Sequence, residues 1–386
     1  MNKKIIEDII SKYDTPIYVF DINKLRNRIK YLKEKLSERI TLCYAIKANT
    51  FIVKDIEDII ERFEVCSPGE YEICKERKID PTKILISGVY KAPKLTEKML
   101  IEDLDINHYT IESMEQFRLF KNTENKLKLW LRLTSGNQFG INESEIEEII
   151  ASREQYKNIE IEGIQYFSGT QKNSLKNVQK ELEYLDEFTK KIGEKYNFEI
   201  NELEIGGGFP VHYFENSDFD EEEYLEGFSK IIDNMSFKGK VILELGRSIA
   251  ASCGNYITKV VDIKTNKNGN FAIVDGGMNH LVYYGQSMAM KVPKFELYPG
   301  RLCDNNSEKW NICGALCTIN DILMKQIPIN NLQIGDLIIF KNTGAYCMTE
   351  GISLFLSRDL PYVIKIKENN EIELVRNNVP TYNLNM

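Results

Sequence analysis

The chain is predicted to fold as a (β/α)8 barrel with a second, mostly β domain. Eight short apolar runs of strand length occur between residues 42 and 244, and charged segments with helical periodicity lie between most of them. After Gly254 the pattern changes to closely spaced β-like runs, which predict the second domain. A chain of 386 residues is also too long for one ordinary core.

The barrel prediction starts after a short amphipathic helix and an extended run at 16–21. Helices are expected at 21–36 and 52–61, and the helix with the clearest apolar face carries Val178 and Leu182. In such barrels the functional residues gather at the carboxyl ends of the strands. The predicted strands cover residues 42–46, 63–66, 83–87, 106–110, 127–133, 161–167, 203–205 and 240–244.

The second domain is predicted from β-like runs joined by turn residues. The pairs Asn268–Gly269 and Asn369–Asn370 are typical of hairpin turns. We expect a barrel domain at 23–258 and a β domain formed by 1–22 together with 259–386. The β-like runs cover residues 260–264, 271–274, 310–313, 336–340, 362–367 and 371–376.

Composition and charge exclude several classes of protein. A net charge of −8 and a pI near 5.3 argue against a nucleic-acid-binding surface. Glu7 and Asp8 interrupt the first apolar residues, so neither a signal peptide nor a membrane span is predicted. The eight cysteines are scattered, which favours reduced thiols in the cytoplasm. Cys313 and Cys317 have no second Cys/His pair, so no metal site is expected.

Lys47 is the central candidate residue. It follows an apolar strand, and a desolvated ammonium loses its proton more readily and becomes a nucleophile toward carbonyls. The alternative is a lysine that only reaches solvent at a strand end. As a set, the predicted strand ends suit a site assembled from many strands, because they include a lysine, an arginine, an aromatic residue and a carboxylate. These ends are Lys47, Ser67, Gly88, Thr110, Arg132, Phe167, Gly206 and Glu244.

Other motifs suit a pyridoxal phosphate bound to that lysine. Consecutive glycines let backbone N–H groups converge on a phosphate, and Gly206, Gly207 and Gly208 follow the seventh predicted strand. A carboxylate such as Glu244 keeps a pyridine nitrogen protonated, and Arg247 can clamp a phosphate or carboxylate. A Glu244–Arg247 ion pair that only closes the barrel is the alternative.

Three further residues carry weaker signals. Phe167 can stack on a planar ring, although aromatic residues at this place more often belong to a core. The Cys317 thiol can donate a proton to a carbanion, and the Tyr346 hydroxyl can bond a phosphate. A buried, inert cysteine is the alternative for Cys317.

Taken together, the chain resembles the fold-type III pyridoxal-phosphate enzymes, the group of diaminopimelate, ornithine and arginine decarboxylases related to alanine racemase. The matching motifs run in the family's order over nearly the whole chain. They are Tyr44–Asn49 (YAIKAN), Gly206–Phe209 (GGGF), Glu244–Ser248 (ELGRS), Asp275–Met278 (DGGM), Cys313–Cys317 (CGALC) with Asp321, and Gly344–Tyr346 (GAY).

The resemblance implies a role for most of these residues. It implies pyridoxal 5'-phosphate held as a Schiff base on Lys47, with Glu244 as the pyridinium partner. It also implies a homodimer with shared active sites, in which Cys317 and Tyr346 enter from the second subunit. The phosphate and ring contacts implied are those of Phe167, Gly206, Gly207, Gly208, Gly246, Arg247 and Tyr346, and the substrate contacts expected are those of Arg247, Met278, Asn279, Thr318 and Asp321.

The departures from the family pattern bear on the substrate. Phe167 stands where the family usually has a histidine, and Thr318 stands where diaminopimelate decarboxylases have a glutamate that reads the distal amine. The run 279–286 lacks the arginine that those enzymes use for a substrate carboxylate. Phe355–Ser357 and the residues around Cys317 look more like the branch that acts on carrier-protein-bound aminoacyl groups and on siderophore intermediates.

The sequence therefore predicts a carboxy-lyase acting on an amino acid or an amino-acid conjugate, free or carrier-linked. Diaminopimelate decarboxylation and racemisation of the alanine racemase type remain alternatives. Glu244 favours decarboxylation, because alanine racemase places an arginine at the pyridine nitrogen. A cofactor-binding protein without turnover is a third class, and the presence of Lys47, Glu244 and Cys317 together argues against it.

Overall fold

The computed structural model describes residues 2–103, 105–215, 219–300 and 307–386. The chain divides into two compact units. One consists of Arg28–Pro210 with Phe219–Ile249, and the other of Met1–Asn27, Val211–Asp218 and Ala250–Met386. The domain limits expected from the sequence, 23–258 against 1–22 with 259–386, stay a prediction.

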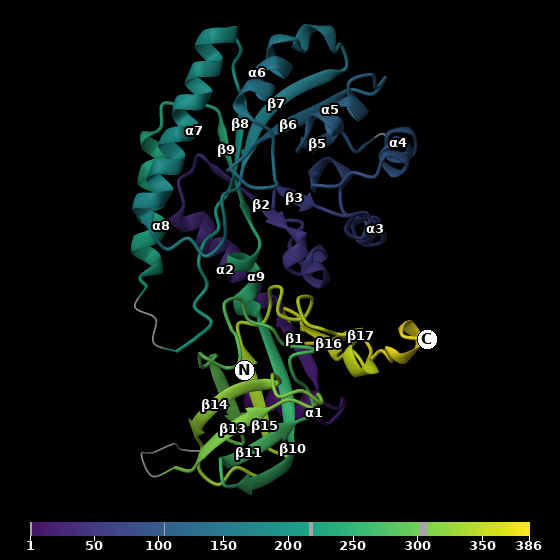
Figure 1. Cartoon of the computed structure of the whole chain (residues 1–386), viewed down its shortest axis with the longest axis vertical. Helices are drawn as coiled ribbons and strands as arrows, with labels where there is room; N and C mark the ends of the chain where they lie inside the picture. Colours follow the sequence, from purple (N-terminus) through teal and green to yellow (C-terminus); the bar gives the residue numbers. More distant parts are fainter. Residues whose placement is uncertain (1, 104, 216–218, 301–306) are drawn as a thin grey trace. The chain divides into compact units, whose positions relative to one another are not determined.

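The first unit is a closed barrel of eight parallel strands, as predicted (Figure 1). Each strand pairs with the next along the chain, and β2 closes the barrel on β9 with Ile40 opposite Val241. The strands are nearly all buried, which explains their continuous apolar runs. They are β2 (Ile40–Ala45), β3 (Arg62–Val65), β4 (Ile84–Ile86), β5 (His108–Ile111), β6 (Leu127–Leu133), β7 (Ile159–Tyr166), β8 (Glu202–Gly206) and β9 (Lys240–Leu245).

The predicted helix at 52–61 is wrong. Two short 3-10 helices, η2 (Thr50–Ile52) and η3 (Lys54–Ile56), occupy this part of the chain. The Asn49 side chain accepts a hydrogen bond from Phe51 N, which stabilises a tight turn in place of an α-helix. The α-helices of this unit are α2 (Ile22–Lys35), α3 (Pro68–Glu76), α4 (Pro93–Glu102), α5 (Met114–Phe120), α6 (Glu143–Ala151), α7 (Leu175–Tyr196), α8 (Glu221–Asn234) and α9 (Arg247–Ala250).

The second unit is a mixed β-sheet with one amphipathic helix, α1 (Lys3–Ile10). The two predicted hairpins are present, β10 with β11 and β16 with β17. Two strands were not predicted, β12 and β14, because they are short or interrupted by polar residues. The strands are β1 (Ile17–Asp21), β10 (Gly254–Asn266), β11 (Gly269–Val274), β12 (Phe295–Tyr298), β13 (Lys309–Cys313), β14 (Ile322–Pro328), β15 (Leu337–Lys341), β16 (Tyr362–Ile366) and β17 (Ile372–Arg376).

Helix α1 covers the apolar core of this sheet. Ile6 and Ile9 pack on Val19 of β1, Ile257 of β10 and Ile339 of β15. The helix is short and marginal by itself, so its stability comes from this packing. Among the helices in the described ranges, none combines the length and the apolar composition needed to cross a bilayer.

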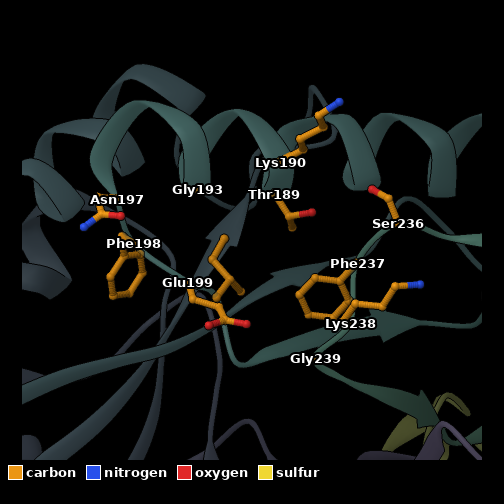
Figure 2. Close-up of a pocket in the computed structure, with 11 residues that line it drawn as sticks. Thr189, Lys190, Gly193, Asn197, Phe198, Glu199, Ser236, Phe237, Lys238 and Gly239 are labelled. Atoms are coloured by element: carbon orange, nitrogen blue, oxygen red, sulfur yellow. The ribbon is translucent and has the colours of Figure 1, made fainter.

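A cavity of about 450 Å³ lies at the amino ends of β8 and β9 (Figure 2). Figure 2 shows Thr189 and Lys190 of α7 above this cavity and Phe237 on its other side. Gly193 belongs to the same helix, and a Cβ built there would meet no atom closer than 3.8 Å. Such barrels carry their chemistry at the carboxyl ends of the strands. This cavity lies at the opposite end of the barrel.

Two glycines of the barrel unit make a matched test of its packing. A Cβ at Gly163 on β7 would overlap Glu202 O and lie 2.7 Å from Trp130 Cδ1, whereas a Cβ at Gly193 would make only an ordinary contact, at 3.8 Å from Phe198 O. We expect Gly163→Ala to destabilise the protein by about 1–3 kcal/mol through overpacking. Gly193→Ala should stabilise it by about 0.5–1 kcal/mol through lower unfolded-state entropy. Denaturant unfolding measures both, and equal effects of the two substitutions would contradict the barrel packing.

Candidate active site

Lys47 lies just beyond the carboxyl end of β2, in a 3-10 turn formed by Ile46–Ala48. Its ammonium donates to Glu64 Oε2 at 2.6 Å, and its Nζ lies 3.5 Å from both Glu244 Oε1 and Cys66 Sγ. The lysine side chain keeps 38% of its surface exposed, whereas that of Glu64 keeps 3%. The amine is therefore open to solvent while the acidic groups that hold it are buried.

Glu64 and Glu244 share this site, and their pKa values are shifted in opposite directions. Burial raises the pKa of Glu64, but the Lys47 ammonium and several hydrogen bonds outweigh burial and hold that pKa well below its ordinary value. Burial, and then the neighbouring charge of Glu64, raise the pKa of Glu244 well above its ordinary value. Two carboxyl groups at close range cannot both ionise cheaply. The pKa of Glu64 is therefore shifted downward and that of Glu244 upward.

A second layer of polar groups supports the pair from inside the barrel. Gln165 Nε2 lies 3.3 Å from Glu244 Oε2 and 3.4 Å from Glu204 Oε1. Arg62 donates to Glu204 and Glu202 at 3.1 and 2.9 Å. Burial raises the pKa of Glu204 to about 7 in spite of this arginine. Arg62 thus supplies a positive charge beside Glu202 and Glu204. Gln165 holds the Glu244 side chain in place.

The glycine loop after β8 packs directly against the end of β7. A Cβ at Gly206 would overlap the ring of Phe167, so glycine is required for this close approach. The structure thus brings Phe167 and Gly206 together, and their roles as ring and phosphate contacts stay a prediction. Gly246 and the buried Arg247 follow β9, and next to them the hydroxyl of Ser248 is buried without a hydrogen-bond partner among the described residues.

Another group of polar side chains lies at the carboxyl ends of β4, β5 and β6. Lys91 is buried and donates to Gly88 O and Gln116 Oε1, and burial lowers its pKa to about 8. Arg132 donates to Glu112 at 2.8 Å. Buried charges are costly and need hydrogen-bond partners. The carboxyl ends of these three strands are therefore lined by paired polar side chains.

The predicted thiol, Cys317, lies in the second unit and is exposed. The alternative of a buried, inert cysteine is therefore not what the structure shows. Thr318 follows it and is partly buried. The buried Asp321 accepts hydrogen bonds from Met278 N at 2.7 Å and Leu316 N at 2.9 Å. The structure thus brings Met278, Cys317, Thr318 and Asp321 into one cluster.

The two remaining predicted residues belong to the same unit. Asn279 is buried, its Nδ2 lies 3.0 Å from His280 Nε2, and its Oδ1 has no hydrogen-bond partner among the described residues. Tyr346 is partly buried and has φ of 64°, in the left-handed region.

Sequence reasoning missed Glu64, Cys66 and Gln165. All three lie in or next to barrel strands that were interpreted only as apolar runs. A charged residue inside a buried strand needs a partner, so Glu64 within Phe63–Val65 was a usable signal. The partner itself becomes visible only when β2 and β3 lie side by side with Ala45 opposite Glu64.

Comparison with known proteins places these features in a family. Residues 22–251 match the family model described as "Pyridoxal-dependent decarboxylase, pyridoxal binding domain". The chain is 26% identical to the L-glutamyl-[BtrI acyl-carrier protein] decarboxylase of Niallia circulans, over 96% of this chain and 93% of the relative. It is 25% identical to the 2-[(L-alanin-3-ylcarbamoyl)methyl]-2-hydroxybutanedioate decarboxylase of Staphylococcus aureus, over 92% and 95% respectively.

A solved structure shows the same fold. The crystal structure of diaminopimelate decarboxylase from Helicobacter pylori complexed with L-lysine superimposes with a TM-score of 0.84, at 23% identity and over 98% of each chain. The family model covers more than half of the 386 residues. The chain therefore belongs to the pyridoxal-dependent decarboxylases, carboxy-lyases that use pyridoxal phosphate.

Proposed function

We propose that this decarboxylase acts on a conjugated amino acid, with Lys47 as the cofactor lysine and Cys317 of a second subunit as the proton donor. The observation that carries the proposal is the position of Lys47 Nζ, 2.6 Å from Glu64 and 3.5 Å from Glu244 at the carboxyl end of the barrel. In such barrels that end carries the chemistry.

The residues at this end fit pyridoxal phosphate. The close approach of Gly206 to Phe167 leaves no room for a side chain, so a phosphate can approach the backbone of this loop closely. The N–H of Gly207 donates to Glu244 O at 3.2 Å, which fixes the loop beside β9. The unpartnered hydroxyl of Ser248 offers a further donor beside Gly246 and Arg247. We propose that these groups, with Gly207, Gly208 and Tyr346, bind the phosphate, and that Phe167 stacks on the ring.

Each polar group would then have one task. When bound, the pyridine ring supplies an electron sink for the carbanion that decarboxylation leaves. Glu64 holds the Lys47 amino group in place through the 2.6 Å hydrogen bond to its carboxylate. Glu244 would serve as the partner of the ring nitrogen, and Gln165 keeps the Glu244 carboxyl group oriented. The Cys317 thiol gives its proton to the α-carbon after carbon dioxide has left.

We further propose that the active sites are shared in a homodimer. Cys317 is exposed, so it is available to a second subunit. Tyr346 belongs to the same unit of the chain as Cys317 and would accompany it. A proton donor on one subunit and the cofactor lysine on the other would make each site incomplete without its partner. Free thiols at Cys43, Cys66, Cys74, Cys313 and Cys317 fit a reducing compartment, and we propose the cytoplasm.

Subunit mixing tests the shared site. We expect inactive Lys47→Ala and impaired Cys317→Ala chains, mixed in equal amounts, to recover about a quarter of wild-type carbon dioxide release, since half of the dimers are mixed and hold one intact site of two. The matched control mixes Lys47→Ala with Glu244→Ala, whose residues lie in one barrel, and should give no recovery. Equal recovery in both mixtures, or none in either after proven subunit exchange, contradicts shared sites.

The substrate proposal rests on the residues that would face its tail. Free diaminopimelate carries a second ammonium and carboxylate, which need fixed partners when they leave water. Thr318 and the run 279–286 offer no charge. The buried Oδ1 of Asn279, without a described partner, can accept a hydrogen bond from an amide N–H. The names of the Niallia circulans and Staphylococcus aureus relatives also state a carrier-protein-bound and a carbamoyl-linked substrate.

A substrate panel tests this proposal. We expect kcat/KM for free meso-diaminopimelate to be at least about a hundredfold below that for the best carrier-linked or citryl-linked amino acid, because two hydrogen bonds to charged groups are missing. Thr318→Glu supplies one of the missing charged groups. It should therefore raise kcat/KM for free meso-diaminopimelate relative to that for the best conjugate. Carbon dioxide release is measured beside α-proton exchange, so that a racemase would be recognised. Faster turnover of free diaminopimelate than of every conjugate would overturn the substrate assignment.

A further inference from the structure

The carboxylate of Asp321 joins two segments that are far apart in the chain. Its Oδ1 accepts from Met278 N at 2.7 Å, and its Oδ2 accepts from Leu316 N at 2.9 Å. Asp321 is only 2% exposed. Both oxygens therefore have backbone partners inside the protein, and neither is directed to solvent.

Two glycines make room for this carboxylate. A Cβ at Gly277 would lie 2.5 Å from Asp321 Oδ2, and a Cβ at Gly314 would overlap the same carboxylate. Real Cβ atoms do not approach an oxygen this closely, so each substitution would push the carboxylate away. The glycines of the Asp275–Met278 and Cys313–Cys317 motifs thus have a steric explanation.

Backbone hydrogen bonds close the turn that carries Cys317. Gly314 N donates to Asp321 O at 2.9 Å, and Asp321 N donates to Thr318 O at 3.2 Å. Ala315 N donates to Gly276 O at 2.8 Å, which ties this turn to the other glycine motif. The Cys317 turn and the Met278–Asn279 segment are therefore held against each other at several points.

We propose that Asp321 is a positioning residue, which fixes the Cys317 thiol and the Met278–Asn279 segment in one arrangement. This role replaces the substrate contact expected from the sequence, and it rests on the proposed function of Cys317 as the proton donor. A proton donor must lie within hydrogen-bond reach of the carbon it protonates, and a displacement of about 1 Å is costly for catalysis. The same carboxylate then couples the position of the thiol to that of the segment facing the substrate tail.

Asp321→Asn is the matched substitution, because it keeps the shape but leaves one oxygen acceptor for two N–H donors. Hydrogen exchange at the Met278 and Leu316 amides should become at least about tenfold faster at one or both sites. Gly277→Ala, which displaces the carboxylate without removing it, should have the same effect. The control is Asp336→Asn, a buried aspartate of the same unit that accepts from Gln333 N at 2.8 Å and should leave both amides unchanged.

Kinetics separate positioning from substrate binding. On the best substrate of the panel, Asp321→Asn should lower kcat with little change in KM, and in a Cys317→Ala background it should cause no further loss of kcat. A higher KM with a loss that persists in that background would show direct substrate contact and overturn the proposal. Unchanged amide exchange in both variants would overturn it as well. If Cys317→Ala alone keeps full kcat, the proton donor is wrong, and amide exchange still decides the role of Asp321.

Discussion

The ion pair between Lys47 and Glu64 is the constraint on which the site depends. Burying an unpaired carboxylate costs several kcal/mol, so Glu64 can remain an anion only while the Lys47 ammonium is within reach. Burial, and then the neighbouring charge of Glu64, raise the pKa of Glu244. We propose that in this arrangement Lys47 carries the cofactor, Glu64 holds the Lys47 amino group in place, and Glu244 is the partner of the ring nitrogen.

Other buried residues fix the positions of the side chains around this ion pair. Gln165 is hydrogen-bonded to Glu244, and Arg62 is hydrogen-bonded to Glu204. The tight packing of Gly206 on Phe167 fixes the loop after β8. In the second unit the Asp321 carboxylate does the same for the exposed thiol of Cys317. In both units, therefore, the proposed catalytic side chain is partly or fully exposed and the carboxylate near it is buried.

The barrel could be predicted because its signal is local: buried parallel strands are apolar runs, and all eight were found. The helix at 52–61 was wrong because apolar spacing does not distinguish an α-helix from successive 3-10 turns capped by Asn49. Strand β12 was missed because it is defined by pairing with β15, not by its own composition. The roles of Glu64 and Asp321 depend on contacts over 17 and 43 residues of sequence, which no local pattern encodes.

Lys91 provides the sharpest competitor for Lys47, because it lies at the carboxyl end of the same barrel and burial lowers its pKa to about 8. The most direct measurement is therefore to reduce the pyridoxal-phosphate-loaded protein with borohydride, digest it, and locate the stable cofactor adduct by mass spectrometry. The account predicts the adduct on Lys47, and none after substitution of Lys47 by alanine. An adduct on Lys91, or on any other lysine of the wild-type protein in place of Lys47, would contradict it.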